Sequence, residues 1–114
     1  SLEDGCATIT NFSAYLIAKG IKYAIGSNDK QIKILVCGGG RKNNFLIKTI
    51  KDYLFDKKNI NLNLIDDYNL NGDFIESQAF GYLAIRSFLD LPISYPKTTG
   101  CINPSVGGRL AKNF

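Results

Sequence analysis

The sequence predicts an α/β fold with the element order α-β-α-β-α around a small parallel sheet. Two short apolar segments, residues 32–36 and 61–65, have the length of strands, and an amphipathic segment with helical spacing separates them. A strand, a helix and a second strand form a βαβ unit, so we expect parallel strands joined by a right-handed crossover. Two strands make a poor independent sheet, which indicates an incomplete lobe.

The N-terminal part of the chain is predicted to be helical over residues 3–18, where apolar side chains recur at helical spacing. Gly20 suits the end of this helix, because glycine adopts the backbone conformations that follow a helix C-terminus. The helix is more apolar than one lying on a free surface, so we expect it to pack on two sides. Residues 21–29 are expected to form a short strand or a turn with its bend at Gly26.

The first strand, residues 32–36, leads through Cys37 into three consecutive glycines, Gly38, Gly39 and Gly40. The pattern that follows predicts an amphipathic helix. Its apolar face carries five residues: Phe45, Leu46, Ile50, Tyr53 and Leu54.

Two interpretations of this glycine turn stay open on the residues alone. A strand, a glycine turn and a helix N-terminus are the parts of a nucleotide or phosphate cradle, because glycine lets a ligand approach the backbone. The turn matches neither the dinucleotide fingerprint nor the Walker loop, so it is equally typical of a tight connection without a ligand. Asn43, three residues on, is expected to cap the next helix or to bind a ribose or base.

The second strand, residues 61–65, is followed by a polar loop over residues 66–72. In open α/β sheets, ligands bind outside the carboxyl ends of the strands. The carboxylates of Asp66 and Asp67 could therefore accept hydrogen bonds from ligand hydroxyls, or they could belong to a solvated turn.

The last predicted helix runs from about Asp73 to Leu89, and its apolar residues nearly encircle it, so we expect it to be buried. Glu76 lies in its first turn. One interpretation is a capping box in which Asp73 is the N-cap and Glu76 reaches back to it. The other is a carboxylate beside the ligand crevice.

The C-terminal part of the chain is predicted to lack regular helix over residues 91–99, which hold two prolines. The tail from Thr99 to Phe114 is expected to be a loop with one short strand.

Composition and charge narrow the classes of function. The chain has 114 residues, a net charge of +4 and no His, which excludes a Ser-His-Asp or Cys-His catalytic arrangement within it and disfavours a zinc site. Ten of its fourteen Lys and Arg residues lie within residues 19–58, around the glycine turn, and a basic region can serve phosphates. No aromatic-basic interleaving of the RNA-binding type is present, so no nucleic-acid partner is expected.

Location is also predicted from simple features. No apolar run is long enough to span a membrane and no signal peptide opens the chain, so no membrane partner is expected. Three scattered cysteines indicate reduced thiols and a cytoplasmic location. The chain begins with Ser and contains no Met, which leads us to expect a piece of something longer.

Three blocks of sequence, in order, resemble the C-terminal part of the anhydro-N-acetylmuramic acid kinase family. The first is the VCGGGRKN segment, in which Gly38, Gly39, Gly40 and Asn43 match the family pattern. The second is NGDFIESQAF, matching at Gly72, Asp73, Glu76, Ala79 and Phe80. The third matches at Thr99 and Gly100. Ser77 replaces the usual Ala, and Asn69 stands where Gly is common. The resemblance covers essentially the whole chain.

This resemblance implies a fold of the sugar kinase–actin superfamily, with residues 1–114 as the C-terminal portion of the second RNase H-like lobe. It implies a kinase that uses ATP, Mg²⁺ and water to open the anhydro ring of an amino sugar and yield the 6-phosphate in cell-wall recycling. Gly38–Gly40 would line the adenosine side of the ATP site with Asn43, and Glu76 would face the sugar. A homodimer is compatible with this assignment.

The resemblance also implies what this chain does not supply. The family's phosphate-binding glycine loop and its catalytic base precede the part that matches, so we expect no catalytic residue and no metal ligand here and no turnover by the chain alone. Two alternatives remain open: a noncatalytic remnant and a nucleotide-binding α/β module.

Overall fold

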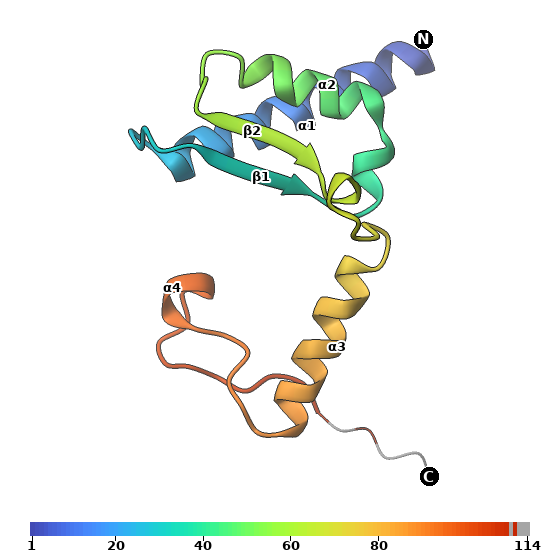
Figure 1. Ribbon diagram of the computed structural model, residues 1–114. Helices are drawn as coiled ribbons and strands as arrows, with labels where there is room; N and C mark the ends of the chain where they lie inside the picture. The colour runs from blue at the N-terminus through green and yellow to red at the C-terminus, as the bar shows by residue number, and fades with distance from the viewer. Residues whose placement is uncertain (110, 112–114) are drawn as a thin grey trace. The chain divides into compact units, whose positions relative to one another are not determined.

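A computed structural model describes residues 1–109 and residue 111 of the chain, which divide into two compact units. The first unit is Ser1–Asp73 and the second is Phe74–Phe114. The elements of the first unit are α1 (Leu2–Ile25), β1 (Ile32–Val36), the 3₁₀-helix η1 (Gly39–Lys42), α2 (Asn44–Tyr53), β2 (Ile60–Leu64) and the 3₁₀-helix η2 (Ile65–Tyr68) (Figure 1). The second unit contains α3 (Ile75–Phe88) and α4 (Pro96–Thr99).

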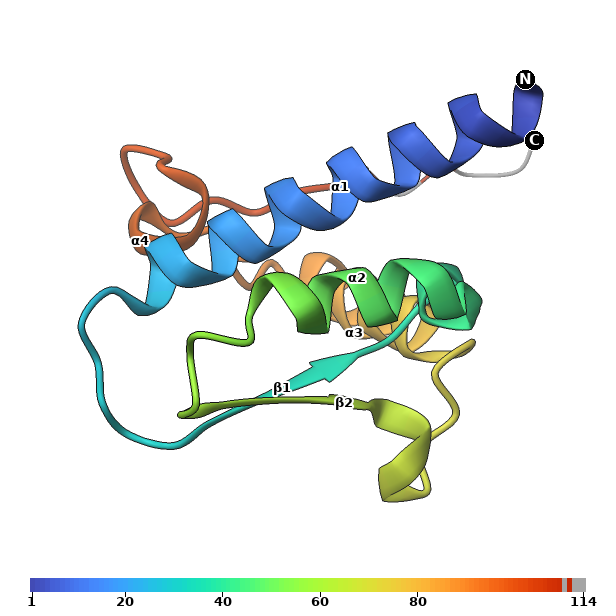
Figure 2. The same ribbon diagram turned by 90° about the horizontal axis from the view of Figure 1, so that it is seen from above.

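The predicted α/β fold with a small parallel sheet is confirmed in the first unit. β1 and β2 pair in parallel, with Ile32 opposite Ile60 and Val36 opposite Leu64. α1 and α2 lie on the same face of this sheet (Figure 2). The second strand begins and ends one residue earlier than predicted. Because β1 and β2 are parallel, their carboxyl ends lie side by side, and the loops that follow the two strands are neighbours.

The first helix is longer than its sequence predicts. α1 continues through Gly20 to Ile25, so the predicted end at Gly20 is wrong, and of the strand or turn predicted over residues 21–29 only the bend at Gly26 is confirmed. Gly26, with φ of 59°, follows the last turn instead. Tertiary packing overrides the weak helix propensity of glycine here, because Ile21 packs against the core on the far side of Gly20.

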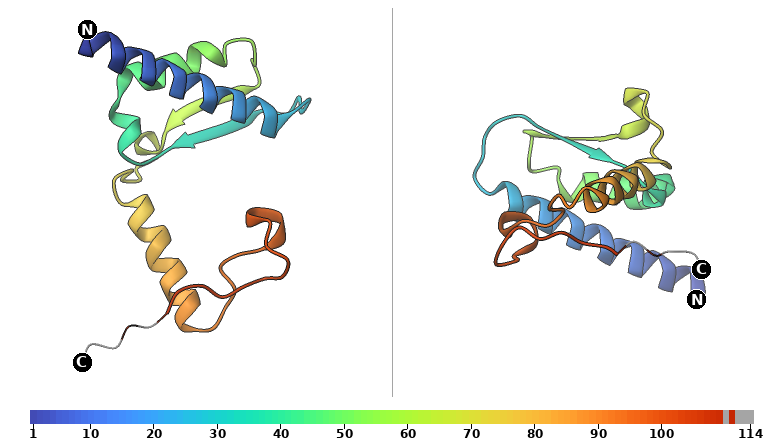
Figure 3. Two further views of the ribbon diagram at one scale, coloured as in Figure 1. Left: turned by 180° about the vertical axis from the view of Figure 1, so that it is seen from behind. Right: turned by 90° about the horizontal axis from the view of Figure 1, so that it is seen from below.

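The core of the first unit lies between α1, α2 and the sheet. α1 lies alongside α2, as the views from behind and below show (Figure 3). Small alanines on α1 permit this close approach. The buried apolar cluster consists of Ala14, Ala18, Ile47, Ile50, Leu54 and Leu62.

The predicted apolar face of α2 is only partly correct. Ile50 and Leu54 are buried as expected, but Phe45 is half exposed and Ile47 is buried in its place. α1 likewise fails to pack on two sides, because Phe12 and Leu16 remain exposed. The apolar pattern measures what a side chain prefers, and it does not say which face a neighbouring element covers.

The second unit also departs from the prediction. α3 starts at Ile75 rather than near Asp73, and none of its residues is buried, so the expectation of a buried helix is wrong for the described chain. Its large apolar side chains, among them Phe80, Ile85 and Phe88, are exposed. No helix in the described residues is both long and apolar enough to cross a lipid bilayer.

The segment after α3 contains one short helix that the prolines were predicted to exclude. Pro96 occupies the first turn of α4, where its missing N–H costs no hydrogen bond. Ser94 and Ser105 form an isolated antiparallel bridge, which is the extent of pairing in the described tail. The rest of the predicted tail, residues 110 and 112–114, lies outside the described residues.

Candidate functional site

The glycine turn after β1 adopts a backbone that only glycine accepts readily. Gly38 has φ of 77° and ψ of 178°, a region essentially restricted to glycine. Its N–H donates to the carbonyl oxygen of Gly72 at 3.0 Å, which joins the loop after β1 to the loop after β2. Gly39 and Gly40 then begin the 3₁₀-helix η1. The turn is therefore a defined connection between neighbouring strand ends.

Space is open beside the middle of this turn. A Cβ atom built on Gly39 would meet no heavy atom within 4 Å, and one on Gly40 would meet only the Leu46 side chain at 3.7 Å. These two glycines are thus dispensable for packing within the chain. An exposed glycine backbone with nothing in front of it is the surface that a flat ligand can approach closely.

Arg41 is the buried centre of the site, with only 6% of its surface exposed. Its Nε and Nη2 donate to the two carboxylate oxygens of Asp66 at 2.6 and 3.0 Å, which is a bidentate pair. Its Nη1 donates to Asp73 Oδ1 at 2.7 Å and to the carbonyl oxygen of Gly38 at 3.0 Å. One guanidinium therefore joins the glycine turn to both ends of the loop after β2.

Gly72 is required by the position of this arginine. A Cβ atom on Gly72 would clash with Arg41, coming within 2.7 Å of Cζ and 2.9 Å of Cδ. The Gly72 N–H faces Asp66 Oδ1 at 3.4 Å. The glycine of the Asn-Gly-Asp segment thus makes room for the guanidinium, and the aspartate that follows it binds the same group.

The charges of the cluster strengthen one another. Hydrogen bonds from Arg41, and then from Lys42, lower the pKa of Asp73 to about 2. The bond from Arg41 also lowers the pKa of Asp66. The same contacts, first with Asp66 and then with Asp73, raise the pKa of Arg41. Lys42 Nζ lies 2.8 Å from Asp73 Oδ2. Because the pKa values of Asp66 and Asp73 are both lowered, the two carboxylates remain charged at neutral pH.

Sequence reasoning missed this cluster. Asp66 was expected either to face a ligand or to lie in a solvated turn, and it instead forms the ion pair with Arg41. Asp67 Oδ2 accepts from the N–H of Leu64 at 3.2 Å, which is a local turn contact. A usable signal was present, because a basic residue follows one strand and acidic residues follow its parallel neighbour.

The predicted site residues fall in both units. Gly38–Gly40 and Asn43 lie together in the first unit, and the capping role of Asn43 is confirmed by its Oδ1, which accepts from the Leu46 N–H at 3.0 Å. Glu76 is exposed in the first turn of α3 in the second unit. The capping box proposed for it does not form, because Phe74 is the N-cap and Asp73 binds Arg41 and Lys42.

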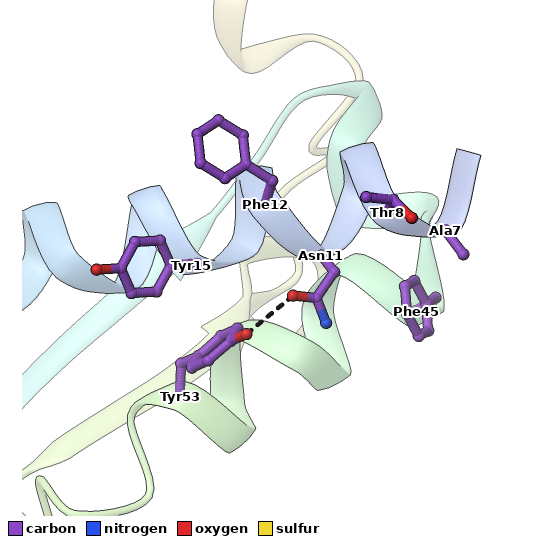
Figure 4. A pocket seen from close by; sticks show the side chains of 7 residues that line it. All are labelled: Ala7, Thr8, Asn11, Phe12, Tyr15, Phe45 and Tyr53. Atoms are coloured by element: carbon purple, nitrogen blue, oxygen red, sulfur yellow. Dashed lines mark hydrogen bonds between the residues drawn. The ribbon is translucent and has the colours of Figure 1, made fainter. Parts of the chain in front are cut away.

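A separate cavity of about 570 Å³ lies between α1 and α2 (Figure 4). Across it, the Tyr53 hydroxyl donates to Asn11 Oδ1 at 2.8 Å. The cavity is lined by Ala7, Thr8, Asn11, Phe12, Tyr15, Phe45 and Tyr53, and it shares none of them with the glycine turn.

Comparisons with known proteins agree on one family. The family model "Anhydro-N-acetylmuramic acid kinase" matches residues 1–112. A protein of that name from Pelagibacter ubique is 52% identical over 113 residues, which cover 98% of this chain and 30% of the relative. The Zymomonas mobilis protein of that name is 41% identical, over 96% of this chain and 28% of the relative.

A third relative, "Anhydro-N-acetylmuramic acid kinase 1" from Jannaschia, is 42% identical over 96% of this chain and 27% of its own length. The chain thus spans less than a third of the curated relatives that it matches.

Proposed function

This chain belongs to the anhydro-N-acetylmuramic acid kinase family, and we propose that it supplies the adenosine side of the ATP site and a sugar-binding carboxylate to such a kinase. In the proposed reaction, ATP and water open the anhydro ring of anhydro-N-acetylmuramic acid, and the 6-hydroxyl receives the phosphoryl group. Family segments that this chain does not match would supply the phosphate-binding loop and the catalytic base. The 114 residues alone are therefore proposed to be inactive.

The observation that carries the proposal is the coincidence of the family match with an open glycine turn. The match runs through the turn, and the turn lies at the carboxyl end of a parallel strand, where α/β folds bind ligands. Open space in front of Gly39 fits a flat adenine or ribose, because a Cβ at this position would fill that space. Asn43 would contribute its exposed amide nitrogen from the start of α2.

The chain's own residues do not fit a Mg²⁺ site. Asp66 and Asp73 are the carboxylates closest to the turn, and both are bound by Arg41. Among residues 1–109 and 111, no three acidic, histidine or cysteine side chains gather as ligands of a metal. We therefore propose that the ion required for phosphoryl transfer is held by the phosphates of ATP and by other parts of the kinase.

The test is an exchange experiment in an intact kinase. This chain would replace the matching segment of the Pelagibacter ubique relative, and the product is called the intact kinase below. We expect it to phosphorylate anhydro-N-acetylmuramic acid with ATP, whereas the purified 114-residue chain gives no product. Activity of the chain alone, or a folded but inactive exchange product that binds no ATP, would contradict the proposal.

Glu76 provides a test of the sugar side. We expect Glu76→Gln in the intact kinase to lower kcat/KM for the sugar roughly tenfold to hundredfold, because a charge-assisted hydrogen bond is replaced by a neutral one. The melting temperature should hardly change, since no capping box exists to be lost. Ser77→Ala, one residue away on the same exposed turn, is the matched control. Near-normal sugar kinetics in Glu76→Gln would remove Glu76 from the sugar site.

A further inference from the structure

We propose that Arg41 is the positioning residue of the nucleotide-binding turn, holding the Gly38–Gly40 backbone in the shape that receives adenosine by tying it to the loop after β2. The inference rests on the proposed function, which places the nucleotide at this turn. It adds a residue that lies behind the turn and acts through the backbone.

The hydrogen bonds of Arg41 converge on two separate segments. On one side, Nη1 donates to the carbonyl oxygen of Gly38, the glycine with the restricted backbone. On the other side, Nε and Nη2 donate to the carboxylate of Asp66, the second residue of η2. The second N–H of Nη1 donates to Asp73 at the other end of the same loop, so four of the five N–H donors of the guanidinium are used. The turn is thus fixed to the end of the neighbouring strand by a single rigid group.

All four of these hydrogen bonds from Arg41 go to oxygens of the protein itself. Its side chain is buried, and its donors are directed at protein oxygens of Gly38, Asp66 and Asp73. Gly72 packs so closely against it that a Cβ atom there would clash with the guanidinium. Open space lies instead in front of Gly39, two residues earlier in the chain. Arg41 therefore shapes the turn without touching the nucleotide.

The shape of the side chain matters more than its charge. A guanidinium is a planar fork that binds a carboxylate through two parallel bonds, whereas a lysine ammonium is a compact point charge. Lysine at position 41 would keep the attraction to Asp66 and lose the simultaneous bond to Gly38. This difference allows a variant that preserves net charge and still releases the turn.

The experiment uses Arg41→Lys, Asp66→Asn and their combination in the intact kinase. Lys48→Met, which removes an exposed charge from α2, is the control. Calorimetry gives Kd for ATP and for the sugar, thermal unfolding gives Tm, and hydrogen exchange without ligand reports on the Gly38 amide. That amide is protected by its bond to Gly72.

We expect each single substitution to weaken ATP binding roughly tenfold, because a turn that is no longer held in its bound shape must be ordered when ATP binds. Sugar affinity should stay unchanged, and the Gly38 amide should exchange faster. The double variant should be no weaker than the worse single variant, since both break one link. Lys48→Met should match the parent in every measurement.

Two results with the variants would overturn the positioning role while leaving the proposed function intact. A lowered Tm with unchanged ATP affinity would make Arg41 a purely structural residue. Weakened ATP binding in Arg41→Lys but not in Asp66→Asn would mean that Arg41 contacts the nucleotide directly. Asp66→Asn is nearly isosteric and keeps the test available if the arginine variant does not fold. An unsubstituted intact kinase that binds no ATP would refute the proposed function itself, and the positioning role with it.

Discussion

The two units of the chain carry similar apolar side chains and bury them very differently. In the first unit, Ile50 on α2 is only 3% exposed because α1 and the sheet enclose it. In the second, Phe80 on α3 is 62% exposed, and no residue of that helix is buried. α2 is amphipathic and needs cover on one face only, whereas the apolar residues of α3 nearly encircle it. A buried core therefore requires elements that face each other, and an apolar composition alone does not produce a buried core.

The largest effect expected from this comparison is on stability. Ile50→Ala should lower the free energy of unfolding of the chain by about 2–5 kcal/mol, because it leaves a cavity in the enclosed core. Phe80→Ala should change it by less than about 0.5 kcal/mol, as for an exposed position. Urea unfolding of both variants measures the contrast. Equal losses would show that α3 is covered in solution and that the two units do not differ in this way.

A pair of glycines sharpens the same contrast at the site. Gly72→Ala should cost about 1–3 kcal/mol, because the added Cβ drives into the Arg41 guanidinium. Gly81→Ala, in the middle of α3 with nothing within 4 Å of the new Cβ, should stabilise that helix by about 0.5–1 kcal/mol. The denaturant midpoints of Gly72→Ala, Gly81→Ala and the parent chain measure these opposite effects. A harmless Gly72→Ala would mean that Arg41 does not occupy the place described.

The smallest effect is expected from pH. Asp73 has a pKa of about 2 in the folded chain against an ordinary value of 3.8, owing to Arg41 and Lys42. A lowered folded pKa gives stability that is present above about pH 4 and is lost as pH falls toward 2. Asp73→Asn should flatten the pH dependence of urea unfolding over this interval. An identical slope in the variant would show that the carboxylate gains nothing from its cationic neighbours.

Local patterns in the sequence were sufficient for the elements around the turn. The short apolar segment at residues 32–36 predicted β1 with its bounds, and the helical spacing after the glycines predicted α2. Capping was one of the two roles predicted for Asn43, and the signal for it lies within one turn of chain. These predictions succeeded because each depends on neighbours in the sequence.

Long-range contacts could not be predicted in the same way. Arg41 and Asp66 are 25 positions apart, and only the parallel pairing of β1 and β2 brings them together. Gly72 was matched as a motif residue, but the need for glycine there follows from the position of Arg41. The continuation of α1 past Gly20 likewise depends on Ile21 reaching the core. Such features require the packing, which no local pattern contains.

Gly39→Ala in the intact kinase tests whether the glycine turn receives the nucleotide, as proposed. The new methyl group meets no atom of the chain within 4 Å, so the fold should tolerate it and Tm should stay close to that of the parent. A nucleotide lying against the backbone would meet the methyl group. We expect calorimetry to show ATP affinity reduced roughly tenfold, because the methyl group would overlap the nucleotide, while sugar affinity is retained. Unchanged ATP affinity in this variant, or in the bulkier Gly39→Val if it folds, would contradict the claim.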